Sequence, residues 1–274
     1  MANLTMTETT RLVPGSKAYE AQSKTVGDTF TVRVYLPYSY EQTQNNYPVL
    51  YLLDGDYSFG LAVATLAYLN LGANFGMGKN VPEMIVVSVG YERGVIPWLL
   101  TRVRDFTPTA DPSFNYNNPN FHVPESGKAD AFLSFLRDDL IPHIESTFRV
   151  DSSDRVIATH SMAGVFALHA ALSQPGVFGR AILASPFVGW DHKAIFDTEQ
   201  RLAAASKELP LTAFFTTAAA EPTPDYSTEV RELFEQMNSR GYAGFRAHLE
   251  HYDTENHFSE WPRAFAEGLA YVYG

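Results

Sequence analysis

The chain of 274 residues has no cysteine, which excludes disulfide bonds, thiolate metal sites and a cysteine nucleophile. It also has no run of about twenty apolar residues, the length that a helix needs to cross a lipid bilayer. The polar first ten residues lack the basic start and apolar stretch of a secretory signal. The sequence therefore predicts a cytoplasmic protein without a membrane partner.

Positive charge is scarce. Lysine and arginine number 20 against 31 aspartate and glutamate residues, which gives a formal net charge of −11 at pH 7. The positive residues are scattered along the chain rather than clustered. Since such a chain is repelled by nucleic acid phosphates, we expect no nucleic acid partner.

The composition is that of a compact globule, with 45% hydrophobic, 14% aromatic and 19% charged residues. The chain shows no internal repeat, low-complexity tract or interdomain linker. We therefore expect a single domain over residues 1–274, with residues 1–15 flexible. The oligomeric state stays open, and a homodimer is possible, because surface patches cannot be identified without coordinates.

The order of strands and helices predicts an α/β fold. Residues 16–25 and 29–36 alternate around a Val26-Gly27-Asp28 turn, which indicates an antiparallel hairpin. The later strands are nearly continuous apolar runs, typical of a parallel sheet covered on both faces. They span residues 47–53, 83–89, 155–160, 180–184, 211–217 and 245–252.

Helical patterns separate these strands. They cover residues 61–71, 128–148, 163–172, 195–207, 227–240 and 259–273. Pro142 is expected to kink the second of them. This alternation predicts a mainly parallel sheet of about eight strands, with an N-terminal hairpin and helices on both faces.

Residues 92–127 form the exception, because they are rich in proline, asparagine and aromatic residues and show little periodicity. Loops of this length in a compact domain are usually functional or disordered. With Trp98 and Phe106 among its aromatic residues, the segment is predicted to be a lid or a pocket wall. The alternative is a surface flap that covers the edges of the core.

Ser161 is the candidate nucleophile, because it lies where the apolar strand 155–160 gives way to a helical pattern. In a nucleophile elbow the positions two before and two after the serine must be small, since the strand and the helix nearly touch there. The usual G-x-S-x-G is represented here by Thr159, Ser161 and Ala163. The alternative is a serine that caps a helix.

A serine nucleophile needs a base and a group that orients the base. His257 is the candidate base, because it follows the last predicted strand in a polar loop, where the hydrolase order of serine, acid and histidine places it. The acid should follow the preceding strand, so Glu221 and Asp225 both qualify. Glu221 is preferred because it lies nearer the strand end, whereas Asp225 precedes a helix as a cap residue would.

The oxyanion of the reaction needs backbone N–H donors. The amide of Met162, directly after the serine, is the first candidate. The second is the amide of Asp56 in Asp54-Gly55-Asp56, where Gly55 permits close approach. The carboxylates of this segment should point away from a developing anion, and the alternative is a plain turn.

The sequence predicts no cofactor and no metal site. Residues 72–79 are glycine-rich but lack the spacing of a phosphate-binding loop or a dinucleotide fingerprint. No histidine pair at helical spacing has a nearby carboxylate, as a zinc site would need.

Four segments resemble the "putative esterase" family of α/β-hydrolases, which includes esterase D and feruloyl esterases, and most closely its siderophore-esterase-like branch. These are Tyr51-Leu52-Leu53-Asp54-Gly55-Asp56, Thr101-Arg102-Val103-Arg104-Asp105-Phe106-Thr107-Pro108-Thr109, the elbow around Ser161, and Glu255-Asn256-His257-Phe258-Ser259. The resemblance spans residues 16–274 and implies the nucleophile Ser161 and the base His257, with Glu221 at the acid position. The family elbow reads G-H-S-x-G-G, so Thr159 and Ala163 are departures.

The predicted substrate pocket combines this resemblance with the aromatic composition around it. Its members are Gly55, His160, Trp98, Arg104, Phe106 and Trp190. A charge pair that anchors the loop is an equal alternative for Arg104, and packing in the core is one for Trp190.

The sequence thus predicts a serine carboxylic-ester hydrolase that acts through an acyl-enzyme on a small to medium ester. Two alternatives remain. An acyltransferase would use the same intermediate with a different acceptor. A binding protein would have kept the fold and lost turnover.

Overall fold

A single eight-stranded sheet organises the computed structural model, which describes residues 13–77, 81–116, 118 and 122–274. The strand order is β1-β2-β4-β3-β5-β6-β7-β8. β1 pairs antiparallel with β2, and β2 antiparallel with β4, whereas every other pair is parallel. The strands are β1 (Ser16–Ser23), β2 (Asp28–Tyr35), β3 (Tyr47–Leu52), β4 (Ile85–Gly90), β5 (Val150–His160), β6 (Arg180–Ala184), β7 (Glu208–Ala220) and β8 (Ala243–Asn256). The predicted fold class is confirmed.

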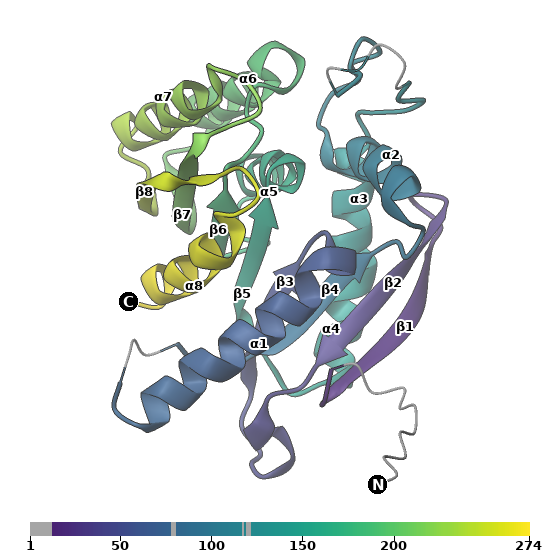
Figure 1. Cartoon of the computed structure of the whole chain (residues 1–274), viewed down its shortest axis with the longest axis vertical. Helices are drawn as coiled ribbons and strands as arrows, with labels where there is room; N and C mark the ends of the chain where they lie inside the picture. Colours follow the sequence, from purple (N-terminus) through teal and green to yellow (C-terminus); the bar gives the residue numbers. More distant parts are fainter. Residues whose placement is uncertain (1–12, 78–80, 117, 119–121) are drawn as a thin grey trace, which may run out of the picture.

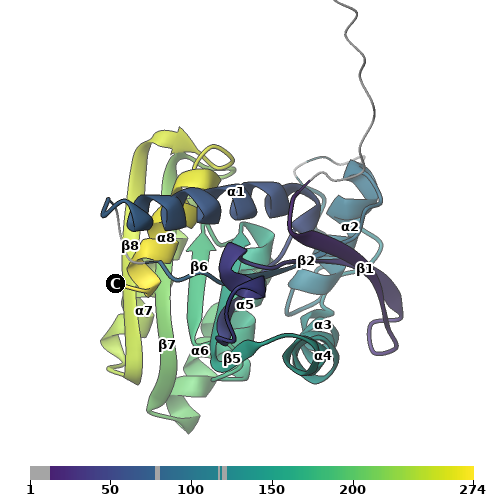
Figure 2. The same cartoon turned by 90° about the horizontal axis from the view of Figure 1, so that it is seen from below.

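Side chains alternate across the sheet and build a core on each face. In β3, Val49 and Tyr51 belong to one core, while Leu50 and Leu52 belong to the other. The second core is covered by α1 (Gly55–Asn74) and α8 (Trp261–Val272), which contact each other. Figures 1 and 2 show these two helices along the same face of the sheet.

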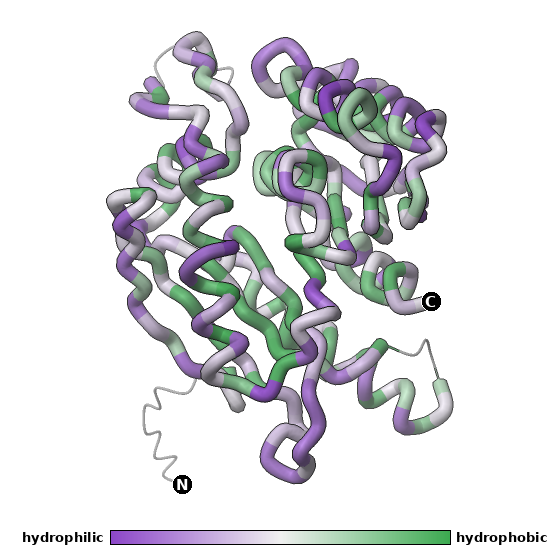
Figure 3. Tube along the Cα trace, turned by 180° about the vertical axis from the view of Figure 1, so that it is seen from behind, coloured by the Kyte–Doolittle hydropathy of each residue, from purple (hydrophilic) through white to green (hydrophobic). Residues whose placement is uncertain are grey.

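The opposite face is centred on α5, in which every residue from Met162 to Leu172 is buried. The interior of the molecule is accordingly the most hydrophobic part of the trace in Figure 3. The remaining helices are η1 (Tyr38–Glu41), α2 (Val95–Phe106), α3 (Ala129–Ser134), η2 (Phe135–Leu140), α4 (Ile141–Thr147), α6 (Trp190–Ala205) and α7 (Tyr226–Ser239).

Helix α2 is the main difference from the prediction, which treated residues 92–127 as irregular. Its buried face carries Arg102 and Asp105 beside Val103 and Phe106, so the apolar periodicity that normally reveals a helix is interrupted. The role of the segment as a lid or pocket wall stays a prediction, and its residues 117 and 119–121 lie outside the described residues. So do residues 1–12 of the terminal segment expected to be flexible.

The helix predicted over 128–148 also differs from a simple proline kink. The residues before Pro142 form η2, a π-helical stretch between α3 and α4. Proline has no N–H and its ring clashes with the carbonyl four residues earlier, here that of Asp138. The wider π turn therefore lies where the α-helical hydrogen bond between residue 142 and the carbonyl of Asp138 cannot form.

The charges in α2 join this helix to the end of β3. Arg102 donates from Nε to Asp54 Oδ1 at 3.0 Å and from Nη2 to Asp54 Oδ2 at 2.7 Å. Trp98 Nε1 donates to the same Oδ1 at 3.0 Å, and the guanidinium lies 4.7 Å from the Trp98 ring centre. Arg102 and Asp54 are both buried, so their charges depend on each other.

Across the described residues, no helix has the length and apolar character required to span a membrane.

Replacing Arg102 by alanine should lower the free energy of unfolding by about 3–5 kcal/mol, because Asp54 is left as an unpaired buried charge. Urea unfolding followed by circular dichroism measures this loss. Arg137→Ala is the matched control, since Arg137 pairs with Asp138 on an exposed surface, and its midpoint should stay at the wild-type value. If Arg102→Ala and Arg137→Ala unfolded at the same urea concentration, the Arg102–Asp54 pair would not stabilise the fold as predicted.

Candidate active site

Ser161 occupies a sharp turn between β5 and α5. Its backbone has φ 60° and ψ −120°, a conformation that L residues rarely adopt. Its amide donates to Ala184 O at 2.9 Å, and its carbonyl accepts from the amides of Gly164 and Phe187 at 2.8 and 3.0 Å. The residue is partly exposed, so the structure presents the hydroxyl at a strand-to-helix elbow as expected.

The elbow accommodates both departures from the family pattern. Thr159 is buried, and its hydroxyl donates to Ile182 O at 3.0 Å, so the added polar group has a partner. Ala163 is fully buried within α5. The tight position is Gly164, where a Cβ would come within 2.6 Å of Pro186. The close approach of helix and loop therefore depends on this glycine rather than on its neighbours.

His257 lies directly after β8 and connects Ser161 to Glu221. Its Nε2 is 2.9 Å from Ser161 Oγ, and its Nδ1 is 2.6 Å from Glu221 Oε2. A carboxylate can only accept, so Nδ1 carries the proton, and Nε2 accepts from the serine hydroxyl. This is the hydrogen-bond order of a serine-histidine-acid triad.

Glu221 follows β7 directly and its side chain is only 4% exposed. Its Oε1 accepts from the Ser185 hydroxyl at 2.5 Å and from the Ala218 amide at 2.8 Å, which leaves Oε2 for His257. The competing carboxylate of Asp225 lies at the exposed start of α7. Its side chain makes no capping hydrogen bond.

His160 supports the base from the strand side. Its Nε2 donates to His257 O at 2.5 Å, and the two rings lie 4.6 Å apart between centres. Burial lowers the pKa of His160 to about 3, with a further contribution from His257. His160 therefore stays neutral at physiological pH and holds the backbone of His257 without adding charge.

The two predicted oxyanion donors lie at helix N-termini. Met162 is the first residue of α5 and Asp56 the second residue of α1. Amides in the first turn of a helix have no acceptor within the helix, so both are suited to bind an anion. The Asp56 carboxylate accepts from the amides of Tyr91 and Glu92 at 2.9 and 2.5 Å, and Asp54 is held by Arg102, so both carboxylates are bound elsewhere as expected.

The other predicted pocket residues divide into two groups. Trp98 lies 4.9 Å from the ring of Tyr57, and both are at least partly exposed beside the Asp54–Arg102 pair. Arg102 in turn donates to His160 O at 3.4 Å, which joins this group to the elbow. Phe258, directly after the base, is 78% exposed and lies 5.3 Å from the His257 ring.

Arg104, Phe106 and Trp190 lie elsewhere, which corrects their predicted position on the pocket wall. Arg104 pairs with Asp105 and with Asp28 of the β1–β2 hairpin, so it anchors α2. Phe106 and Trp190 are each 1% exposed. Such side chains present almost no surface to a substrate, and both belong to the hydrophobic core.

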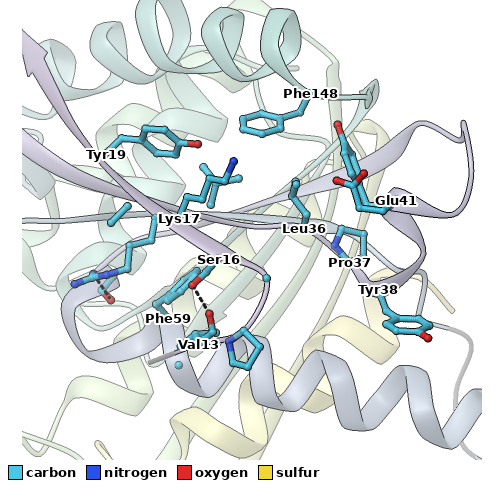
Figure 4. Close-up of a pocket in the computed structure, with 18 of the residues that line it drawn as sticks. Val13, Ser16, Lys17, Tyr19, Leu36, Pro37, Tyr38, Glu41, Phe59 and Phe148 are labelled. Atoms are coloured by element: carbon cyan, nitrogen blue, oxygen red, sulfur yellow. Dashed lines mark hydrogen bonds between the residues drawn. The ribbon is translucent and has the colours of Figure 1, made fainter. Parts of the chain in front are cut away.

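Figure 4 shows a large groove whose lining includes none of Ser161, His257 and Glu221. It has a volume of about 890 Å³ and lies beneath the hairpin and beside the start of α1. Lys17, Tyr19 and Phe148 line it, as do Gly55 and Asp56. Gly55 and Asp56 therefore have this groove beside them, in addition to their place at the predicted oxyanion segment.

One group of side chains in the described residues has the spacing of metal ligands. His160, His257 and Glu260 offer atoms within 4.8 Å of one another. Both ring nitrogens of His257 are already bound to Ser161 and Glu221, and His160 Nε2 is bound to His257 O. A metal ion here would have to replace the hydrogen bonds of the triad.

Three residues near the triad were not found from the sequence. Ser185 holds Glu221, Tyr226 donates to Ser185 O at 2.8 Å, and Glu260 is a fully buried carboxyl behind them. A single serine after a strand and a single glutamate before a helix are both common in sequences. Ser185 and Glu260 therefore belong to no recognisable motif.

A known protein family matches most of this chain. The family described as "Putative esterase" matches residues 23–272. The chain is 27% identical over 265 residues to ferri-bacillibactin esterase BesA of Bacillus subtilis (strain 168), covering 95% of this chain and 90% of that protein.

Two solved structures share the fold. The BES protein from Bacillus cereus matches with a TM-score of 0.85 at 23% identity, over 97% of this chain and 99% of that chain. The siderophore hydrolase EstA from Aspergillus nidulans matches with a TM-score of 0.82 at 20% identity, over 99% and 98%. The chain therefore belongs to the putative esterase family, as an esterase of the α/β-hydrolase fold with siderophore esterases among its relatives.

Proposed function

We propose that this protein is a serine esterase that hydrolyses carboxylic esters through an acyl-enzyme. One observation carries the proposal, the continuous hydrogen bonding from Ser161 Oγ through His257 to Glu221. The three groups come from separate parts of the chain, 96 and 36 residues apart in sequence. An arrangement in which each atom has its catalytic partner supports a reaction more strongly than any one motif.

The reaction begins when Ser161 Oγ attacks the ester carbonyl and His257 Nε2 takes the hydroxyl proton. Glu221 stabilises the imidazolium that forms, while the amides of Met162 and Asp56 bind the developing oxyanion. His257 then protonates the departing alcohol, which leaves the acyl group on Ser161. Water, activated by the same histidine, releases the acid and restores the serine.

Hydrolysis is favoured over the two alternatives by specific features. The partial exposure of Ser161 leaves a path for water, whereas efficient acyl transfer needs a site that excludes it. A protein that had lost turnover would not need the hydrogen bonds that join Ser161, His257 and Glu221. Both are present here, which argues against that alternative.

For the substrate we propose an ester of the siderophore type. The relative that matches nearly the whole chain is named for ferri-bacillibactin. The exposed Phe258 and Tyr57, with Trp98 beside Tyr57, offer aromatic surface near the triad for a planar or apolar part of such a molecule.

A fluorophosphonate probe should attach to Ser161, because only an activated serine reacts at a useful rate. Intact mass spectrometry with peptide mapping gives the site. Ser161→Ala should prevent labelling and lower ester turnover by at least about a thousandfold, while Ser153→Ala, at an exposed position of β5, should leave both unchanged. An unlabelled wild-type Ser161 would refute the mechanism.

Glu221→Gln should lower kcat by roughly 10²–10⁴, because a neutral amide stabilises the imidazolium poorly and favours the wrong tautomer. Asp225→Asn is the matched carboxyl-to-amide control and should keep kcat at the wild-type value. Steady-state hydrolysis of a p-nitrophenyl ester measures both. The opposite ranking would make Asp225 the acid.

The ratio of kcat/KM for ferri-bacillibactin to that for p-nitrophenyl acetate should fall about two- to tenfold in Phe258→Ala, since one aromatic contact contributes about 0.5–1.5 kcal/mol. Product formation by liquid chromatography gives both rates. Tyr38→Ala removes an equally exposed aromatic residue distant from the triad and should leave the ratio unchanged. Failure of the wild-type enzyme to cleave ferri-bacillibactin would reject this substrate class.

A further inference from the structure

A second carboxyl group lies buried behind the triad. Glu260 is fully buried, at the residue before α8, and its amide donates to Asn256 O at 3.1 Å. Its Oε2 accepts from the Thr216 hydroxyl at 2.8 Å. Its Oε1 has no hydrogen-bond partner among the described residues. Such a carboxyl needs either a cation or a proton, because an ionised oxygen without partners is costly in the interior.

The surroundings of Glu260 supply no positive charge. Within the described part of the chain, two histidines lie near Glu260. His160 Nε2 is 4.0 Å from Oε1, and His160 is neutral. His257 has a ring nitrogen within 4.8 Å of a Glu260 oxygen, and its two nitrogens are bound to Ser161 and Glu221. Burial, together with the charges of Glu221 and Glu255, raises the pKa of Glu260 to about 7, although the hydroxyls of Ser185 and Thr216 act to lower it. The titratable groups that face it from the neighbouring elements are His160, His257, Glu221, Tyr226, Tyr252 and Glu255.

Ser185 connects this carboxyl to the triad. Its hydroxyl donates to Glu221 Oε1 at 2.5 Å. The same hydroxyl acts to lower the pKa of Glu260, so it lies near that carboxyl as well. One hydroxyl has one proton, so it cannot donate to two carboxylates at once. If Glu260 is protonated, it can donate to Ser185 Oγ while Ser185 donates to Glu221, and every group then has a partner.

Ser185 is itself fixed in place. Its backbone has a positive φ of 34°, its amide donates to Thr216 O at 3.2 Å, and its carbonyl accepts from the Tyr226 hydroxyl. The backbone of Ser185 is therefore held in place, and its hydroxyl is bound to Glu221 Oε1.

We propose that Glu260 is a positioning residue whose neutral carboxyl completes a hydrogen-bond chain through Ser185 to Glu221 and thereby keeps Glu221 directed at His257. This inference rests on the proposed serine esterase function. Glu260 touches no reacting atom. It acts by fixing which oxygen of Glu221 is free to accept from His257 Nδ1.

The proposal has a definite pH dependence. Below pH 7 Glu260 keeps its proton and the chain is complete. As the pH rises through about 7 the proton is lost, Ser185 loses its donor, and a second negative charge appears beside Glu221. A glutamine at this position would donate from its amide at every pH, because it does not titrate.

The test compares Glu260→Gln and Glu260→Ala with the wild-type enzyme. At pH 6, Glu260→Gln should keep kcat within about twofold, whereas Glu260→Ala, which leaves the chain without its donor, should lose about tenfold in kcat with KM unchanged. Between pH 6 and pH 8.5 the ratio of kcat for Glu260→Gln to that of wild type should rise. Glu267→Gln, on the same helix and partly exposed, is the control and should show a constant ratio.

Infrared spectroscopy gives a readout that does not depend on turnover. The wild-type protein should show the carbonyl band of a buried protonated carboxyl at pH 6 that disappears by pH 8.5, and Glu260→Gln should lack it. This comparison still decides the question if Glu260→Ala does not fold. Failure of the proposed esterase function would instead be recognised by a wild-type Ser161 that the fluorophosphonate does not label.

Three results would overturn the inference. They are a missing infrared band, an equal loss of kcat in the glutamine and alanine variants at pH 6, and a wild-type kcat in Glu260→Ala.

Discussion

The structure depends on one backbone constraint, the positive φ of Ser161 at the junction of β5 and α5. A residue in this region costs about 1–3 kcal/mol and persists only where its surroundings enforce it. Here the amide and carbonyl of Ser161 are bound to three backbone partners, and Gly164 lies in close contact with Pro186. The same turn exposes the hydroxyl and places the Met162 amide at the start of a helix. The proposed nucleophile and one of the proposed oxyanion donors thus follow from a single local conformation.

The parallel arrangement of the sheet explains how the remaining groups reach that turn. β5, β6, β7 and β8 are neighbours, and their carboxyl ends lie at one edge. Ser161 follows β5, Ser185 follows β6, Glu221 follows β7 and His257 follows β8. Each of these four strands delivers one polar residue to the same place. The hydrogen bonds between strands therefore fix the distances within the site, and the site needs no long mobile loop to assemble it.

The parallel strands could be predicted from the sequence, because a strand that is buried on both faces is a nearly continuous run of apolar residues. Chain order also singled out Ser161 and His257, and the structure places His257 Nε2 2.9 Å from Ser161 Oγ. The sequence did not predict α2, since Arg102 and Asp105 occupy the buried face and break the apolar pattern. Their partners, Asp54 and Tyr91, lie 48 and 14 residues away, and such pairings are visible only in three dimensions.

The same limit applies to the surroundings of the acid. Glu221 was identified because it ends a strand, but the hydroxyl that orients it comes from another strand 36 residues earlier. Phe106 was placed on the pocket wall because aromatic residues in an irregular segment suggest one, and Trp190 because it follows Ser185-Pro186-Phe187. Both instead fill the core, where Trp190 Nε1 donates to Thr109 O at 3.0 Å and so satisfies its polar group. Composition indicates that aromatic residues are present, whereas only packing determines which of them remain accessible.

Asp54 and Glu221, two buried carboxylates near the elbow, have different partners, and this difference suits the proposed reaction. Asp54 is bound to the guanidinium of Arg102, so its charge is largely cancelled beside the elbow. Glu221 receives only a hydroxyl, an amide and the Nδ1 hydrogen of His257, none of which carries a formal charge before the reaction. Its negative charge is therefore uncompensated until His257 accepts the serine proton. Because the ion pair forms only at that point, its attraction stabilises the transition state more than the resting enzyme, which is the condition for a faster chemical step.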